Sequence, residues 1–137
     1  MENKTLITVL RWIAVLPASV IGSILAHLIG SLYTWINSGG YSWYTGSSHT
    51  GIVEITLFAV QNILTGAAFV AAGWYISPSH KNTVKTVLAT LATTICIISI
   101  ILAILTNTAE WHVYLSAIAT AGGAIYTAAK LTENDKN

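Results

Sequence analysis

The chain has 137 residues, of which 54% are hydrophobic and only 8% are charged. A water-soluble domain is on average about a quarter charged, so this composition excludes an ordinary soluble globular domain. The formal net charge of +1 and the lack of a basic arm exclude nucleic acid as a partner. The length leaves no room for a second folded core, so residues 1–137 are predicted to form a single domain.

Four long apolar stretches follow one another at residues 12–36, 51–76, 83–105 and 109–129. The hydrocarbon core of a bilayer is about 30 Å thick and needs roughly 20 apolar helical residues to cross it, a length that each stretch reaches. Backbone groups in lipid must bond within their own segment, so these stretches are predicted to be helices rather than open strands. We therefore predict an all-α integral membrane protein whose four transmembrane helices form an up-down-up-down antiparallel bundle.

The first stretch has two features of its own. Residues 5–11 are apolar enough either to start the first helix early or to lie along the membrane interface. Pro17 follows about one turn inside the membrane, where it removes a backbone hydrogen bond and is expected to kink the helix. The apolar run continues to Ile36 without a small-residue cleavage site, so we expect a retained span rather than a cleaved signal peptide.

All six lysines and arginines lie on one side of this four-span pattern. They precede the first stretch, lie at the junction of the second and third, and follow the fourth: Lys4, Arg11, Lys81, Lys85, Lys130 and Lys136. Cytoplasmic loops carry the excess of Lys and Arg, so both termini are predicted to lie in the cytoplasm and residues 37–50 outside. The form resembles that of many small four-span bacterial membrane proteins, which favours a multi-pass protein of a cell membrane, here the bacterial inner membrane.

Each stretch carries small and polar residues at helical spacing. Helices in lipid associate through small residues and interhelical hydrogen bonds, so these stripes are predicted to be the inward faces. They are Ser19, Ser23, His27, Gly30 and Thr34; Glu54, Gln61, Thr65, Ala68 and Ala72, with Asn62, Gly66 and Gly73 beside them; Thr86, Thr90, Thr93 and Thr94; and Ser116, Thr120, Gly123 and Thr127.

Depth along the helices brings four of these polar residues to one level. At a rise of about 1.5 Å per residue, His27 and Gln61 both lie roughly 4–5 Å outside the membrane midplane, and Ser116 falls near the same layer. We predict a hydrogen-bonded layer of His27, Gln61, Asn62 and Ser116. Two interpretations stay open. The layer either locks helix packing, or forms a path for a proton or solute, since an ionisable group inside a membrane is a candidate functional site.

A second cluster is predicted at the outer ends of the helices and consists of His49, Glu54, Glu110 and His112. Two imidazoles and two carboxylates are ligands that zinc accepts. Carboxylates at helix N-termini are also stabilised by the helix dipole, which explains Glu54 and Glu110 without a ligand. Glu110 and His112 are two residues apart and would point to different faces of a regular helix, which argues against a metal site. We expect ordinary interfacial residues here, with an ion pair or proton-entry cluster as the first alternative, and no metal or cofactor.

The sequence contains no G-x-S-x-G, H-E-x-x-H or C-x-x-C motif and no phosphate-binding glycine loop, so we predict that the protein is not an enzyme. Its single cysteine, Cys96, is expected to be a small buried residue rather than a reactive thiol. We predict a membrane scaffold or accessory subunit whose partners are the lipid bilayer and either a second copy or another membrane protein. The alternative is a small oligomeric channel, transporter or pore former that uses His27 and Gln61. A membrane enzyme or metal-binding protein using the outer cluster has the least support.

Overall fold

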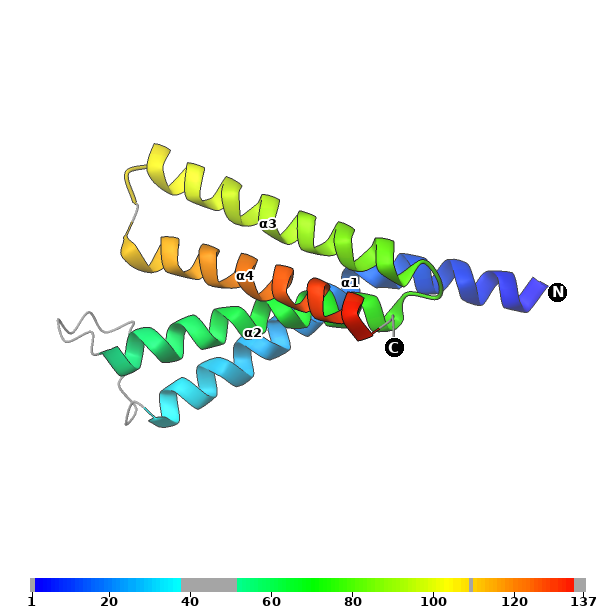
Figure 1. Cartoon of the computed structure of the whole chain (residues 1–137), viewed down its shortest axis with the longest axis horizontal. Helices are drawn as coiled ribbons and strands as arrows, with labels where there is room; N and C mark the ends of the chain where they lie inside the picture. The colour runs from blue at the N-terminus through cyan, green and yellow to red at the C-terminus, as the bar shows by residue number, and fades with distance from the viewer. Residues whose placement is uncertain (1, 38–51, 109, 135–137) are drawn as a thin grey trace.

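The computed structural model describes residues 2–37, 52–108 and 110–134, and the regular structure in this part of the chain is entirely α-helical. Its helices are α1 (Glu2–Asn37), α2 (Ile52–Ile76), α3 (Lys81–Leu105) and α4 (Trp111–Asn134), as labelled in Figure 1. This confirms the all-helical prediction. The helices match the apolar stretches closely, except that α1 begins well before residue 12 and α4 continues past residue 129.

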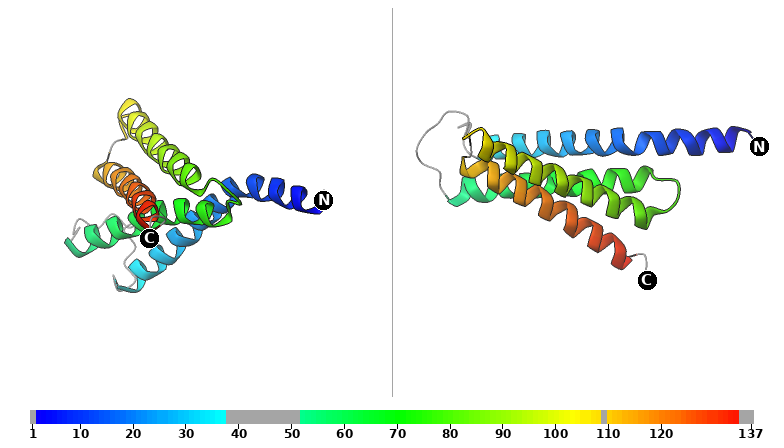
Figure 2. Two further views of the ribbon diagram at one scale, coloured as in Figure 1. Left: turned by 45° about the vertical axis from the view of Figure 1, so that its right-hand side comes forward. Right: turned by 90° about the horizontal axis from the view of Figure 1, so that it is seen from above.

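Successive helices run in opposite directions, so both termini and the turn between α2 and α3 lie at one end of the molecule (Figure 1). The central helix is α2, which packs closely against α1 and α4 and more lightly against α3, while α3 packs mainly against α4. In the view of Figure 1 the helices converge toward the end with the termini, whereas in the right view of Figure 2 α1 and α4 diverge toward that end, so the helices cross at an angle. The bundle is therefore open, since among the described residues the backbone of α1 approaches only that of α2.

The first helix, α1, has 36 residues and continues through Pro17. Residues 5–11 therefore extend the helix, which was one of the two predicted alternatives. The N-terminal part of α1 (dark blue) and the rest of it (light blue to cyan) run in different directions in Figure 1 and in the left view of Figure 2. Such a bend is expected at a proline, which lacks the N–H that would bond to the carbonyl one turn earlier.

The hydrophobic core is small and takes residues from all four helices. It consists of Val15, Val70, Val84, Leu88, Ala89, Ala92 and Ala124. Glycines bring α2 and α4 together elsewhere: a Cβ on Gly66 would meet the backbone carbonyl of Thr120, and a Cβ on Gly123 would meet that of Ile63. Lipid is as apolar as the side chains, so helices in a membrane associate through such close packing rather than through apolar burial.

Most large apolar side chains point outward instead of into this core. Ile13, Ile29 and Leu102, on α1 and α3, are each more than half exposed. An exposed apolar surface of this extent marks contact with a membrane or another protein. Three helices, α1, α2 and α3, are long and apolar enough to cross a membrane, and they indicate a membrane protein.

The fourth helix differs from the other three. It has 24 residues, yet it is less apolar than α1, α2 and α3 and does not meet the same condition for a membrane span. Small and hydroxyl-bearing residues lower its hydropathy, and α4 packs against both α2 and α3. A helix with neighbours on two sides needs fewer lipid-facing residues. The prediction of a fourth span therefore lacks the support that length and apolarity give to the first three.

The inward face of α3 is not the predicted threonine stripe. The buried residues of α3 are Val84, Lys85, Leu88, Ala89, Ala92, Cys96 and Ala103, whereas Thr86, Thr90 and Thr94 are exposed and Thr93 is half-buried. Each of these threonine hydroxyls donates to the carbonyl four residues earlier, at 2.8–3.0 Å. The hydroxyl protons are thus already bonded within α3, so burying these threonines against another helix would add no hydrogen bond. The alanine side of α3 permits closer packing and turns inward instead.

Candidate functional site

Gln61 of α2 is the centre of a polar cluster between α1 and α2. Its side chain is 2% exposed. The amide Nε2 donates to Ser31 Oγ at 2.7 Å and to the backbone carbonyl of His27 at 3.3 Å. The same nitrogen lies 3.3 Å from Nδ1 and 3.4 Å from Nε2 of the His27 imidazole. Thr34 Oγ1 donates to Gln61 Oε1 at 3.5 Å. We call His27, Ser31, Thr34 and Gln61 the α1–α2 polar cluster.

Gly30 makes room for this cluster. A Cβ at this position would lie 2.6 Å from Cγ of Gln61, closer than real Cβ contacts allow. The absence of a side chain lets the Gln61 stem lie directly on α1, and the hydroxyl of Thr34 bonds to the Gly30 carbonyl at 2.9 Å. Further along the same interface, Gly22 packs against Ala68 and Ala72. Gly30, which the sequence placed on the first stripe, and Gly22 therefore set how closely α1 approaches α2.

Asn62 makes a separate contact on the other side of α2. Its side chain is buried, and its Oδ1 accepts a hydrogen bond from Ser116 Oγ of α4 at 2.7 Å. Its amide Nδ2 donates to the Phe58 carbonyl one turn earlier, at 2.8 Å. One turn further along α2, Gly66 brings the two backbones into contact. The Asn62–Ser116 bond thus fixes the pairing of α2 with α4.

The four residues of the predicted layer therefore form two pairs. Gln61 bonds to α1 and Asn62 bonds to α4, because adjacent residues on a helix point about 100° apart and α2 has a neighbour on each side. His27 and Gln61, which the helical rise places at one level, are in contact as predicted. The sequence could not say which of two adjacent amides faces which helix.

The chemistry available to the α1–α2 polar cluster is limited. General acid–base or nucleophilic catalysis needs a base in contact with a nucleophile and an orienting third group. Here the nearest polar neighbour of the imidazole is an amide, and Ser31 is bonded to that same amide. Gln61 is buried, whereas His27 is exposed at the edge of the interface. The imidazole therefore lies on the outer surface of the helix pair and not inside an enclosed path between helices.

At the start of α4, the side chains of Glu110 and His112 meet, with 3.3 Å between Glu110 Oε2 and His112 Nδ1. The expectation that they point apart assumed a regular helix, but α4 begins at Trp111, so Glu110 precedes it and can fold back. Both side chains are exposed, and such pairs contribute little to stability. His49 and the side chain of Glu54 lie outside the described residues. Within the described part, no three His, Cys, Asp or Glu residues are close enough together to hold a metal ion.

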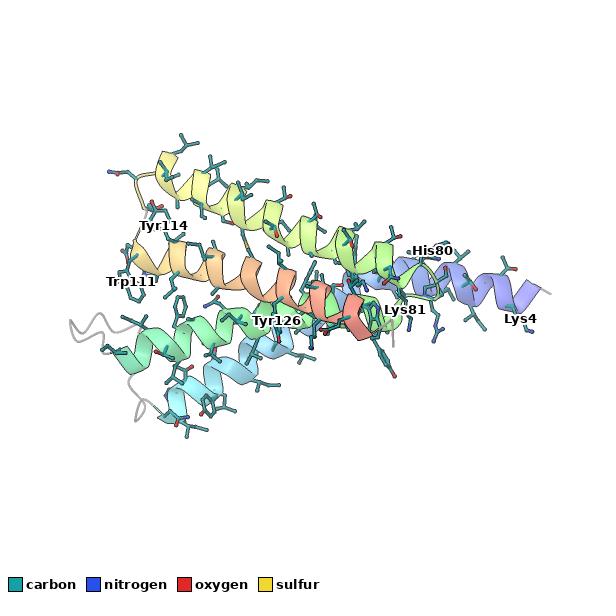
Figure 3. The ribbon with its side chains drawn as sticks, in the orientation of Figure 1. Lys4, His80, Lys81, Trp111, Tyr114 and Tyr126 are labelled. Carbon is teal, nitrogen blue, oxygen red and sulfur yellow. The ribbon has the colours of Figure 1, made fainter. Side chains whose placement is uncertain are left out.

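Trp111 anchors this end of α4 against α2. Its ring lies edge-on to Phe58, with 6.3 Å between centroids, and edge-on to His112, with 5.9 Å. Figure 3 shows Trp111 and Tyr114 at the end of the molecule opposite to Lys4, His80 and Lys81. Trp111 and Tyr114 at this end, and Trp74 beside Lys81 at the basic end, follow the pattern expected of helices whose aromatic residues meet the two membrane interfaces.

The basic end contains one buried lysine that the sequence did not predict. Lys81 is exposed, and its Nζ lies over the ring of Trp74, 4.6 Å from the centroid. Lys85, one turn further along α3, is only 1% exposed. The charge pattern assigned both residues to the cytoplasmic side without distinguishing them. Only the packing of the helices at this end reveals that the Lys85 side chain lies inside the protein.

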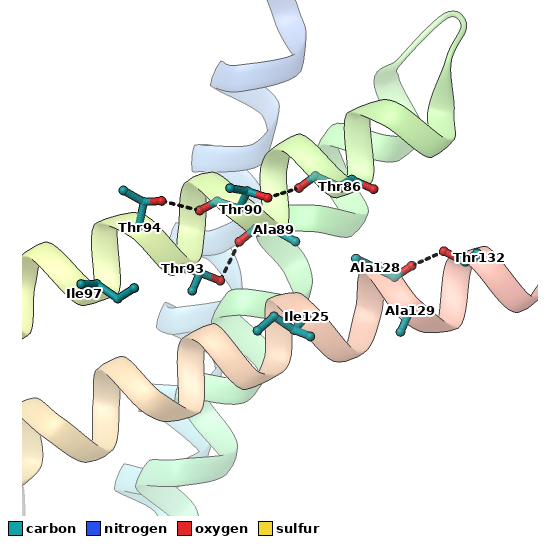
Figure 4. A pocket seen from close by; sticks show the side chains of 10 residues that line it. All are labelled: Thr86, Ala89, Thr90, Thr93, Thr94, Ile97, Ile125, Ala128, Ala129 and Thr132. Carbon is teal, nitrogen blue, oxygen red and sulfur yellow. Dashed lines mark hydrogen bonds between the residues drawn. The ribbon is translucent and has the colours of Figure 1, made fainter.

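A groove of about 590 Å³ lies between α3 and α4, and the sequence did not predict it. Its lining consists of Thr86, Ala89, Thr90, Thr93, Thr94, Ile97, Ile125, Ala128, Ala129 and Thr132 (Figure 4). Every threonine hydroxyl in this lining donates to its own helix backbone. The groove therefore has no charged group and no unbonded hydroxyl proton, which makes it a poor site for a polar substrate.

No protein family model matches this chain, and neither a characterised protein nor a solved structure is detectably similar to it. The class of the protein therefore follows from its helices. Three apolar helices of membrane-spanning length indicate a membrane protein, which is all-helical in the part of the chain that the structure describes.

Proposed function

We propose that this chain is a non-enzymatic membrane scaffold or accessory subunit whose four helices cross a cell membrane. The observation that supports this proposal is that the buried polar side chains of α2 bond to the neighbouring helices. Gln61 and Asn62 hold neighbouring helices together through bonds to His27, Ser31 and Ser116. Groups that serve helix packing in this way leave little for catalysis, and much of the protein surface is apolar and exposed.

The orientation is part of the proposal. Both termini and the α2–α3 turn share one end of the molecule, which carries Lys4 and Lys81 (Figure 3). The positive-inside rule puts such an end in the cytoplasm, in this case that of a bacterial cell. The less apolar α4 crosses the membrane beside α2 and α3, which cover part of its surface.

Cysteine labelling tests this orientation. In a Cys96→Ala background, Thr108→Cys is expected to react with a membrane-impermeant maleimide in intact cells, because the α3–α4 turn faces outside. Asn82→Cys, at the start of α3 beside Lys81, is expected to react only after the cells are permeabilised. Both positions are exposed in the structure, so accessibility to the reagent differs only through the membrane. The reverse pattern would contradict the orientation, and equal labelling of both positions in intact cells would contradict membrane insertion.

A small oligomeric channel or transporter is the second candidate, and one observation favours it. His27 is ionisable, lies in a membrane-spanning helix and is exposed. Ionisable groups at this depth usually face a water-filled cavity or another protein. Since the imidazole lies on the outer surface of the α1–α2 pair, a path along it would require walls from further subunits.

Flux through proteoliposomes distinguishes the two candidates. We expect the purified protein to give no flux of protons, Na⁺, K⁺ or Cl⁻ above that of empty liposomes, because the described polar groups bond to one another. A scaffold also predicts a defined partner, either a second copy or another membrane protein, that remains bound in mild detergent. Flux that disappears in His27→Leu but persists in the lipid-facing control Ile29→Leu would support the channel and overturn the scaffold.

A further inference from the structure

The side of α1 that carries His27 is covered only at one edge, where Gln61 of α2 contacts His27 and Ser31, and no other described helix approaches it. Buried positions on α1, such as Ser19, Gly30 and Thr34, face α2. Beside them a second stripe runs along the helix through Val20, Ile24, His27 and Ser31, spaced by three or four residues and hence on one side of the helix. We call these four residues the α1 flank. Val20, Ile24 and His27 are exposed, and Ser31 is half-buried.

We infer that the α1 flank is the interface for a second copy of this chain. The inference rests on the proposed function, because it requires α1 to cross a membrane. An imidazole turned toward lipid hydrocarbon is unfavourable, and ionisable side chains inside membranes almost always face protein or water. Neither α3 nor α4 of the same chain comes close to α1 here, so the cover must come from outside the described helices.

The hydrogen-bonding groups of the α1 flank suit a second copy. A two-fold interface brings the same patch together from both subunits, so the patch must be its own complement. A neutral imidazole has one donor and one acceptor nitrogen, and Gln61 Nε2 can donate only to the acceptor, so the N–H of His27 is left for a partner. Ser31 Oγ accepts a bond from Gln61 and keeps its own proton to donate and a second lone pair to accept. The flank therefore offers both donors and acceptors, and it has no Lys, Arg, Asp or Glu whose charge would repel its copy.

The shape of the flank also permits close approach. Ser31 is small and lies one turn from His27, so a second helix can come near the imidazole without a large side chain in between. The rest of this surface is apolar, with Ile24 on the flank and Leu28 beside it both more than half exposed. Two copies of α1 packed along this stripe would remove both imidazoles from lipid at once. The α1 flank thus recognises the same flank of a second copy, which lies at the same depth in the bilayer.

Disulfide cross-linking in membranes tests the inference. In a Cys96→Ala background, one variant carries Ile24→Cys on the flank and the matched control carries Ile29→Cys. Both native isoleucines are more than half exposed, but Ile29 lies on the far side of the helix from His27. Two cysteines bridge only when their Cα atoms lie within about 7 Å of each other. With the protein diluted in lipid, we expect an oxidant to yield dimers of Ile24→Cys and essentially none of Ile29→Cys. Equal yields, or no dimer from Ile24→Cys, would overturn the inference.

A second experiment tests whether the His27 imidazole contributes to the dimer. Adding His27→Leu to the Ile24→Cys variant is expected to weaken the dimer about eightfold, the effect of losing two average interhelical hydrogen bonds in a membrane, one from each copy. Adding Ile29→Leu instead changes only the far side of α1 and is expected to leave the dimer yield close to its starting value. An unchanged yield with His27→Leu would overturn the role given to the flank.

Failure of this inference and failure of the proposed function give different results. A photoreactive residue at position 24 that cross-links to another protein, without self-dimers, would overturn the second-copy inference and leave the scaffold intact. Dimers of Ile24→Cys together with His27-dependent flux would support the α1 interface and overturn the scaffold.

Discussion

Replacing Gly123 by alanine is expected to destabilise the protein by about 1–3 kcal/mol, as overpacking of a tight contact does. A Cβ at this position would lie 2.9 Å from Cα of Ile63 and would also meet the Ile63 carbonyl group, both of which are backbone atoms. Backbone atoms cannot turn aside as a flexible side chain can, so α4 would have to move away from α2. The measurement is the free energy of unfolding in a titration with a denaturing detergent.

The next residue supplies a matched control for this prediction. Gly122 lies on the same helix, and a Cβ there would meet nothing within 4 Å. Gly122→Ala is therefore expected to be neutral or to stabilise α4 by up to about 1 kcal/mol through helix propensity. Gly66→Ala tests the same contact from α2, because its Cβ would meet the backbone of Thr120. Equal effects of Gly122→Ala and Gly123→Ala would mean that α2 and α4 do not meet as described.

Replacing Gln61 is expected to loosen α1 from α2 by an amount that depends on the new side chain. Gln61→Ala removes the bonds to Ser31 and His27 and leaves a cavity against Gly30, and we expect a loss of about 2–3 kcal/mol. Gln61→Met keeps a side chain of similar length and removes only the polar group, and we expect a loss of about 1 kcal/mol or less. The same detergent titration measures both.

The difference between the two Gln61 variants separates packing from hydrogen bonding. A methionine variant as unstable as the alanine variant would mean that the hydrogen bonds, and not the contact with Gly30, hold α1 in place. If neither variant changed the unfolding free energy, the α1–α2 polar cluster would have no structural role, and the interpretation of Gln61 as a packing residue would be wrong.

Part of the candidate site could be predicted from the sequence. Helices follow from local information, because each apolar stretch must bond its own backbone groups and must reach the length of the membrane. The rise per residue is also local, so the common level of His27 and Gln61 could be calculated before their contact was known. The helix bounds and this contact in the structure agree with those calculations.

The choice of neighbours required the tertiary structure. Gln61 and Asn62 are adjacent in the sequence and chemically alike, yet one bonds to α1 and the other to α4. The threonines of α3 looked like an inward stripe but bond to their own backbone and remain mostly exposed. Glu110 reaches His112 only because α4 begins one residue after it.

These outcomes have one physical reason. Whether a residue is helical depends on bonds within a few residues of it, and the sequence alone determined that four helices form and where the basic ends lie. Which faces meet depends on how closely two backbones approach, and that distance is decided by glycines on different helices, such as Gly66 and Gly123. Because such contacts join residues far apart in the chain, only the tertiary structure decided that the backbone of α1 approaches that of α2 alone and that His27 stays at the surface.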